Sequence, residues 1–463
     1  MTMAILKTIA LAALLAAQAA HAGVLAEHPG RWMGAITIPD GPTLRLGADI
    51  YTRADGSTWA SMASPDQGQY DMPLRSVKED GKAADLVLPF GTLAVRWEDD
   101  HFEGEWKQGG ASFPLSLRQV DDFPRKARAQ TPRPPFPYHQ ETLAIAAGDG
   151  VMLGATLSLP QGVKRPPVLV LVHGSGPSTR DAEFDGHLPF RVLADHLARR
   201  GIAVLAYDKR GNGRSSGNYE TLTTETLADD AQAAVRALRA RNQFSRVGML
   251  GLSEGSSLVA AVAARAPREV DFAVSMAGVG LPGLDNILLQ DRIETLDAGA
   301  TPEEAERVVS YAGTYYRTIV AHLDADARMG ALKALQAAQP DAVAILAKYK
   351  MGTGSLRLEE ARNPWLRTAL MRDPGADWRA VRVPVLALNG SLDHQVPAKE
   401  NIAGIAAALR KGGNKRVETA ILPNLNHLFQ TAKTGAVAEY ATIDETMAPA
   451  VLERVAAFVK RQR

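Results

Sequence analysis

The stretch VGMLGLSEG, residues 247–255, joins a short apolar run to a G-x-S-x-G motif. Its first four residues predict a buried strand, and residues 256–265 after it predict a helix. A serine in the sharp turn between them projects from the sheet, and Gly251 and Gly255 are needed there because side chains would collide with neighbouring backbone. The helix N-terminus stabilises developing negative charge. We therefore predict that Ser253 is a nucleophile, with helix capping as the alternative role.

Further apolar runs on both sides of this stretch predict the rest of one domain. Helical segments separate the runs, which favours a mostly parallel sheet covered on both faces. The predicted strands are Val168–Val172, Ile202–Ala206, Phe272–Met276, Val383–Leu388 and Glu418–Leu422, with an edge hairpin of Gln140–Ala147 and Val151–Leu159. The predicted helices include Phe190–Arg199, Leu222–Ala240 and a closing helix, Ala448–Arg461. The sequence therefore predicts a doubly wound α/β domain over residues 138–463, with eight strands.

A second motif, His173-Gly174-Ser175-Gly176-Pro177, directly follows the run VLVLV. A turn at this place aims a main-chain N–H back at Ser253. We assign the oxyanion hole to the backbone amides of Ser175 and Glu254, which would bind the oxygen that becomes negative in a tetrahedral intermediate. His173 is interpreted as a brace of the loop rather than as a base.

The segment Asp208-Lys209-Arg210-Gly211 follows another predicted strand. Its alternating charges are typical of a turn held by ion pairs within itself. We interpret it as scaffold, and direct substrate contact is the alternative.

A serine hydroxyl needs a neighbouring base to accept its proton, and histidine has a suitable pKa. His427 lies just after the last predicted strand, in the segment PNLNH, where a loop can fold back over the serine. The acid that orients this imidazole is predicted to be Asp393, which follows the preceding strand in the segment GSLD. The chain order Ser253, Asp393, His427 differs from the orders in chymotrypsin and subtilisin types.

Five motifs together, HGSGP, DKRGNGRSSG, GLSEG, GSLD and NLNH, resemble those of bacterial serine α/β-hydrolases over roughly residues 138–463. With the N-terminal segment included, the chain looks like exported two-domain carboxylesterases. The resemblance implies cleavage of carboxylic esters through an acyl-enzyme on Ser253. Similar proteins often carry histidine before the nucleophile and a second glycine after Gly255, where this chain has Leu252 and Ser256. Neither position supplies a triad group, so the departure bears on substrate preference.

Two other functions remain open from the sequence. A serine aminopeptidase or oligopeptidase uses the same triad on the same fold, and a non-catalytic binding protein could keep the frame without the activity. Lys and Arg number 52 against 51 Asp and Glu, so neither nucleic acid nor an anionic membrane surface is an expected partner. The proposed chemistry needs no cofactor or metal, and no His, Asp and Glu cluster with metal-ligand spacing is evident.

The N-terminus carries the pattern of a secretory signal peptide, predicted to cover residues 1–22 with cleavage near Ala22 and Gly23. Lys7 precedes the apolar run Ile9–Ala17, and small residues stand before the cleavage point. The run is too short for a membrane-spanning helix, so no stable membrane anchor is expected. The chain has 0 Cys, which removes disulfides and a lipidated cysteine. We expect a periplasmic or secreted protein.

Residues 23–122 are predicted to form a small antiparallel β-domain, because short β-type runs alternate there with Gly, Asp and Pro turns. Four of the six tryptophans fall in it, and we interpret them as its core, with a sugar-binding strip as the alternative. Residues 123–137 contain five prolines and predict a linker without regular structure.

About a hundred residues separate the predicted strands ending at Met276 and beginning at Val383, too many for one crossover helix. We predict a helical lid over residues 279–380 that covers Ser253 and shapes the acyl pocket. The predicted lid helices are Pro302–Leu323, Arg328–Ala338, Asp341–Tyr349 and Ser355–Met371. Tyr311, Tyr315, Tyr316 and Tyr349 are pocket candidates, with lid core as the favoured role for each. The many lid charges favour soluble, short-chain esters.

Overall fold

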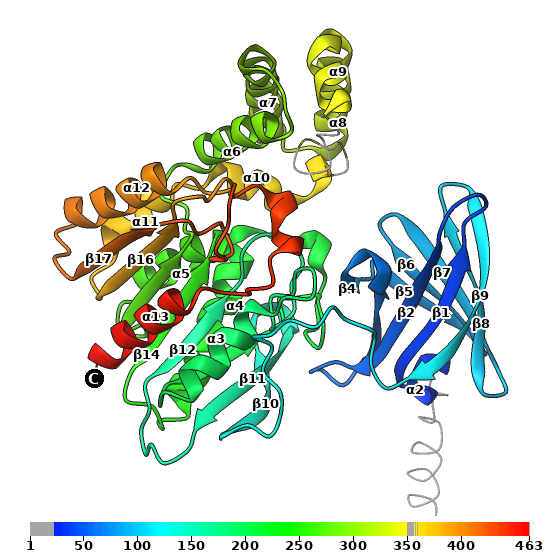
Figure 1. Cartoon of the computed structure of the whole chain (residues 1–463), viewed down its shortest axis with the longest axis horizontal. Helices are drawn as coiled ribbons and strands as arrows, with labels where there is room; N and C mark the ends of the chain where they lie inside the picture. The colour runs from blue at the N-terminus through cyan, green and yellow to red at the C-terminus, as the bar shows by residue number, and fades with distance from the viewer. Residues whose placement is uncertain (1–22, 350–355, 357, 359, 463) are drawn as a thin grey trace, which may run out of the picture. The chain divides into compact units, whose positions relative to one another are not determined.

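The computed structural model describes residues 23–349, 356, 358 and 360–462 (Figure 1). The predicted signal peptide, residues 1–22, and lid residues 350–355 lie outside this part of the chain. The chain divides into two compact units, with the boundary between Arg125 and Lys126. None of the described helices is both long and apolar enough to cross a membrane.

The first unit is a curled antiparallel sheet of nine strands in the order β4-β3-β2-β1-β9-β8-β7-β6-β5 (Figure 1). The strands are β1 Gly30–Thr37, β2 Thr43–Thr52, β3 Thr58–Ser64, β4 Gln69–Pro73, β5 Ser76–Asp80, β6 Ala83–Leu88, β7 Gly91–Glu98, β8 His101–Gln108 and β9 Ala111–Val120; a 3-10 turn, η1, spans Pro65–Gln67. A short helix, α2 (Val24–Glu27), buries Val24 and Leu25 in the same apolar core. Trp32 and Trp106 are buried in that core and Trp59 and Trp97 pack against it, which confirms their predicted role.

The second unit contains a mixed sheet of eight strands in the order β10-β11-β13-β12-β14-β15-β16-β17. The strands are β10 Tyr138–Ala146, β11 Met152–Pro160, β12 Val168–Val172, β13 Ala203–Tyr207, β14 Val247–Leu252, β15 Phe272–Met276, β16 Val385–Gly390 and β17 Val417–Leu422. The edge hairpin of β10 and β11 is antiparallel, as predicted, β11 also runs antiparallel to β13, and the remaining neighbours are parallel.

Strand β12 explains why the central runs are continuously apolar. Val168, Val170 and Val172 pack into one core, while Leu169 and Leu171 pack into another on the opposite face. A strand with solvent on one side would alternate apolar and polar residues instead. Helices on both faces supply the rest of these two cores (Figure 1). Those helices are α3 Pro189–Ala198, α4 Thr224–Ala240, α5 Glu254–Arg265, α11 Pro374–Ala380, α12 Ala398–Lys411 and α13 Pro449–Arg461.

The insertion between β15 and β16 is helical, as the lid prediction required. Its helices are α6 Gly283–Asp297, α7 Pro302–Ala321, α8 Ala325–Ala338, α9 Pro340–Lys348 and α10 Pro364–Met371, with a 3-10 turn, η4, at Glu360–Arg362. These helices have an apolar core of their own. Elsewhere in the second unit the 3-10 turns are η2 Gly148–Gly150, η3 Tyr219–Thr221 and η5 Val437–Thr442. Helices α6, α11 and α12 were not predicted from the sequence.

The proline-rich segment 123–137 has no helix or strand. Its later part is nevertheless fixed within the second unit. The buried guanidinium of Arg128 donates to the carbonyl oxygens of Ile443 (2.7 Å) and Asp185 (2.8 Å). This part of the segment is therefore not a free spacer.

Candidate active site

Ser253 occupies the turn between β14 and α5, with φ 57° and ψ −123°. These angles lie in a sparsely populated region for a residue with a side chain, which is typical of a functional turn held by its surroundings. Its N–H donates to the carbonyl oxygen of Met276 (2.9 Å) on the neighbouring strand. A Cβ atom on Gly255 would lie 2.2 Å from the carbonyl oxygen of Val172, and one on Gly251 would lie 2.2 Å from the backbone of Gly255. The turn therefore has no room for side chains at either glycine.

The loop after β12 lies against Ser253. A Cβ atom on Gly174 would lie 3.1 Å from the Cβ atom of Ser253. Ser175 lines the same pocket as Ser253 and Glu254. The amide of Glu254 begins α5, where helix N–H groups lack intrahelical acceptors. The two amides assigned to an oxyanion hole thus belong to two segments that meet at the serine, the loop after β12 and the start of α5.

His427 and Asp393 form a buried pair on the loops after β17 and β16. Nδ1 of His427 lies 2.9 and 3.0 Å from the two carboxylate oxygens of Asp393. Oδ1 of Asp393 also accepts from the amides of Gln395 (3.0 Å) and Val396 (2.8 Å), which fix the carboxylate. The contact leaves the other ring nitrogen of His427 as the one that can exchange a proton with a substrate or nucleophile.

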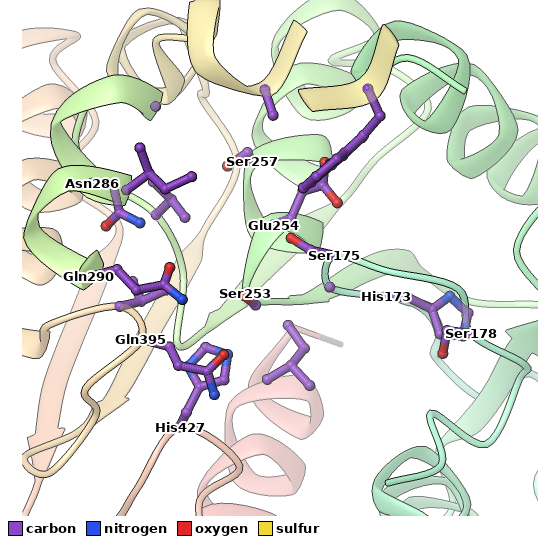
Figure 2. Close-up of a pocket in the computed structure, with 18 of the residues that line it drawn as sticks. His173, Ser175, Ser178, Ser253, Glu254, Ser257, Asn286, Gln290, Gln395 and His427 are labelled. Atoms are coloured by element: carbon purple, nitrogen blue, oxygen red, sulfur yellow. The ribbon is translucent and has the colours of Figure 1, made fainter. Parts of the chain in front are cut away.

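A pocket of about 440 Å³ brings these groups together (Figure 2). Ser253 and His427 both line it, with Asp393 behind the imidazole. Lid residues supply a large part of the wall, and they come from α6 and α10: Gly283, Asn286, Ile287, Gln290, Trp365, Leu366, Ala369 and Leu370. The remaining wall includes Phe184, Thr224, Leu252, Ser257, Val279, Val396, Leu428 and Tyr440. Polar groups are thus scattered over a largely apolar surface.

The four lid tyrosines do not line this pocket. Tyr311, Tyr315 and Tyr316 are fully buried in the lid core, and Tyr349 packs against it. The pocket interpretation of these residues is wrong, and the lid-core interpretation is confirmed. The reason is that α7, which carries three of them, packs behind α6 and α10.

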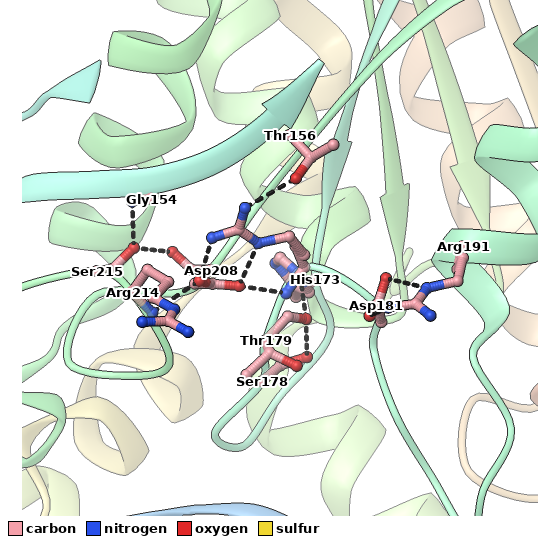
Figure 3. Close-up of polar contacts among 11 residues, drawn as sticks. Gly154, Thr156, His173, Ser178, Thr179, Asp181, Arg191, Asp208, Arg214 and Ser215 are labelled. Atoms are coloured by element: carbon pink, nitrogen blue, oxygen red, sulfur yellow. Dashed lines mark hydrogen bonds and ion pairs between the residues drawn. The ribbon is translucent and has the colours of Figure 1, made fainter. Parts of the chain in front are cut away.

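His173 has the bracing role that the sequence predicted. It is buried, and Nε2 lies 3.0 Å from the carbonyl oxygen of Thr179 in the same loop (Figure 3). Burial lowers its pKa to about 3, and the ammonium of Lys209 adds to this effect. A ring with so low a pKa is neutral at ordinary pH, as suits a structural histidine.

The prediction that residues 208–211 pair among themselves is wrong. Asp208 accepts two hydrogen bonds from the guanidinium of Arg180 (2.9 and 2.6 Å) and one from the amide of Arg214 (2.8 Å; Figure 3). Arg210 instead pairs with Asp230 of α4 (2.6 Å). The two ion pairs therefore connect this loop to the loop that carries Arg180 and to helix α4.

Lys209 carries a role that the sequence did not reveal. Its buried ammonium donates to the carbonyl oxygens of Gly174 (2.6 Å) and Gly176 (2.8 Å), on either side of Ser175.

Two pocket side chains were also missed, the carboxylate of Glu254 and the amide of Asn286. Asn286, Gln290 and Glu294 recur at intervals of four residues, and this polar stripe was the available signal for α6. Among the described residues, no group of His, Asp and Glu could hold a metal ion.

Comparisons with known proteins give a family match and a curated relative. A family model described as serine aminopeptidase, S33, matches residues 167–431. The esterase EstD of Thermotoga maritima is 26% identical over 278 residues, which cover 60% of this chain. The chain spans 58% of the length of that relative.

Similar solved structures include both esterases and a peptidase. An esterase of Pyrococcus furiosus is 16% identical, with a TM-score of 0.42, 70% of this chain covered and 90% of the other. Est1E of Butyrivibrio proteoclasticus is 16% identical, with a TM-score of 0.41 and coverage of 69% and 98%. A proline iminopeptidase of Mycobacterium smegmatis is 17% identical, with a TM-score of 0.43 and coverage of 70% and 98%. Since the family match takes in more than half of the chain, this protein belongs to the serine aminopeptidase S33 family of α/β-hydrolases.

Proposed function

We propose that this protein is a serine hydrolase that cleaves carboxylic esters, with Ser253 as nucleophile, His427 as base and Asp393 as the group that orients the base. One observation carries the proposal. Ser253 and His427 line the same pocket, and Asp393 holds the ring nitrogen of His427 that faces away from it. The name of the Thermotoga maritima relative, an esterase, supports the ester as substrate.

The reaction follows from the proton that the imidazole can hold. Nε2 of His427 accepts the hydroxyl proton as Oγ of Ser253 attacks the ester carbonyl carbon. The amides of Ser175 and Glu254 bind the negative oxygen of the tetrahedral intermediate, and Asp393 stabilises the imidazolium. The C–O bond then breaks, and His427 returns the proton to the leaving alcohol. Water, deprotonated by the same nitrogen, attacks the acyl-enzyme and releases the acid.

The size of the pocket supports short acyl chains. A volume of about 440 Å³ lies toward the small end of ligand pockets and suits an acetyl or butyryl ester better than a long-chain one. A serine aminopeptidase, the activity in the description of the family, is the second candidate because it uses the same triad.

The deciding experiment compares p-nitrophenyl acetate, butyrate and decanoate with an aminoacyl p-nitroanilide, using the purified protein and its Ser253→Ala variant. We expect the acetate and butyrate to be hydrolysed with a higher kcat/KM than the decanoate or the anilide. The variant should lose several orders of magnitude in kcat. Faster cleavage of the anilide would make the protein a peptidase, and full activity in the variant would remove Ser253 from the mechanism.

A further inference from the structure

Two buried oxygen atoms, on residues that line the active-site pocket, have no hydrogen-bond donor among the residues that the structure describes. They are Oε2 of Glu254 and Oδ1 of Asn286, whose residues are only 8% and 7% exposed. Buried polar atoms are nearly always paired in proteins, because an unpaired one loses the hydrogen bonds that water gave it. Two such acceptors in one pocket indicate that a bound substrate supplies the donor.

The carboxylate of Glu254 is held in place before any substrate binds. Oε1 of Glu254 accepts from Nε1 of Trp365 (2.5 Å), which fixes the carboxylate plane. Trp365 is itself set at the start of α10, where its amide donates to Oδ1 of Asn363 (2.9 Å). Asn286 belongs to α6, the other lid helix that lines the pocket. Glu254 therefore comes from α5 and Asn286 from α6, and α10 lines the same pocket.

The position of the acceptors points to the acyl part of the ester. His427 has to protonate the departing alcohol, so the alcohol leaves on the side of the imidazole and the acyl chain extends to the other side of Ser253. In the view of Figure 2, Glu254 and Asn286 lie beyond Ser253 on the side away from His427. Gln395, which also lines the pocket, lies beside His427.

The local charges favour a neutral donor. The ammonium of Lys209 is buried behind the pocket and is attracted by the carboxylate of Glu254. The positive charge of Lys209 therefore offsets part of the negative charge of Glu254. A substrate ammonium would add an uncompensated positive charge to a buried site, whereas a hydroxyl group supplies a donor without one.

We propose that the pocket selects esters whose acyl chain carries a hydroxyl group, which donates to Oε2 of Glu254 or Oδ1 of Asn286. This inference rests on the esterase function proposed above and adds the class of acid to it. A site built to accept a hydrogen bond discriminates strongly against the analogue that lacks the hydroxyl, because the acceptors then remain unpaired.

The test uses phenyl esters of butyric acid, 2-hydroxybutyric acid, 3-hydroxybutyric acid and 3-aminobutyric acid. Each kcat/KM is divided by the rate constant for hydroxide-catalysed hydrolysis of the same ester, which removes differences in intrinsic reactivity. We expect at least one hydroxy ester to exceed the butyrate by tenfold or more, and the amino ester to stay near or below the butyrate.

Two variants locate the selectivity. Asn286→Leu removes one acceptor at similar volume, and Glu254→Gln places an NH₂ donor where Oε2 stands while its oxygen still accepts from Trp365. At least one of these variants should reduce the ratio of hydroxy ester to butyrate threefold or more. Gln395→Leu, a polar-to-apolar change on the other side of the pocket, should leave that ratio unchanged. Thermal unfolding checks that each variant is folded.

The outcomes separate this inference from the proposed function. Hydrolysis of the butyrate without preference for either hydroxy ester, or a preference for the amino ester, overturns the inference and leaves the esterase. A preference that survives in both Asn286→Leu and Glu254→Gln also overturns it. If p-nitrophenyl acetate and all four phenyl esters resist hydrolysis, the esterase proposal fails, and this inference fails with it.

Discussion

The ammonium of Lys209 donates a hydrogen bond to the carbonyl oxygen of Gly174 across 2.6 Å. With the bond to Gly176, it holds both sides of Ser175, whose amide we assign to the oxyanion hole. We expect Lys209→Met to lower kcat for p-nitrophenyl butyrate by 10- to 100-fold, roughly the order of losing part of one oxyanion donor, with little change in KM. The reason is that a loosened loop still binds the ester but no longer meets the oxyanion. Steady-state kinetics measures this separation of kcat from KM.

A matched control exists on the surface of the same unit. The ammonium of Lys126 donates to the carbonyl oxygen of Ala441 (2.9 Å), and neither residue lines the pocket. Lys126→Met should leave both kinetic constants unchanged. If Lys209→Met instead raises KM and keeps kcat, or binds a phosphonate analogue of the transition state as tightly as the wild type, the positioning role is wrong.

The second prediction concerns the orientation of His427. Asp393→Asn keeps the shape of the side chain but presents an amide to Nδ1, which favours the wrong tautomer of the imidazole. We expect kcat to fall by about 10⁴-fold while the protein stays folded. The neighbouring pair of His394 and Asp297 (2.6 Å) provides the control. Asp297→Asn should retain full activity, and an equal loss in both variants would argue against the assignment of Asp393.

The sheet and the pairing of Asp393 with His427 could be predicted from the sequence because both depend on local signals. Val168–Val172 is apolar at every position, as expected of a strand that is buried on both faces. Several of the central strands are also followed directly by a recognisable motif. A side chain such as Asp393 follows its strand directly, so the fold alone brings it to the sheet edge that Ser253 occupies.

The features that the sequence analysis missed depend on tertiary contacts. The partner of Asp208 is Arg180, 28 residues earlier in another loop, and no spacing rule connects them. Helix α6 packs against α7 and also lines the pocket, so apart from the polar stripe of Asn286, Gln290 and Glu294 no separate apolar face marks it as a helix. For Tyr315 the sequence favoured the lid core and left the pocket open, and the packing of α7 decided between them.

The third prediction tests the space around the elbow. Gly255→Ala places a Cβ atom 2.2 Å from the carbonyl oxygen of Val172 and 2.6 Å from that of His173, both of which are backbone atoms. Because neither can move without shifting β12 or its loop, we expect a loss of about 1–3 kcal/mol in the free energy of unfolding. The esterase activity should fall at least tenfold. Urea unfolding and the butyrate assay measure the two effects.

Gly330 in α8 is the matched control, because a Cβ atom there meets nothing within 4 Å. Gly330→Ala should raise the free energy of unfolding by about 0.5–1 kcal/mol, the usual gain for alanine in a helix interior. Similar stabilities for the two variants would mean that the elbow tolerates a side chain.

The last prediction follows from a carboxyl group buried inside the lid. Asp291 of α6 accepts a hydrogen bond from the hydroxyl of Tyr316 in α7 (2.9 Å), and burial raises its pKa from 3.8 to about 7. Between these two values the folded protein binds a proton that the unfolded chain has released. Stability from this group is therefore complete below about pH 4 and is lost as the pH rises to 7, at up to about 1.4 kcal/mol per pH unit.

Asp291→Asn keeps an acceptor for Tyr316 but cannot ionise. We expect the variant to be more stable than the wild type at pH 8, and this advantage to shrink toward pH 5. Urea unfolding at both pH values measures it, with Asp285→Asn, an exposed carboxyl on the same helix, as the control. Wild type and Asp291→Asn with parallel pH dependence would show that Asp291 ionises as freely in the folded lid as in the unfolded chain.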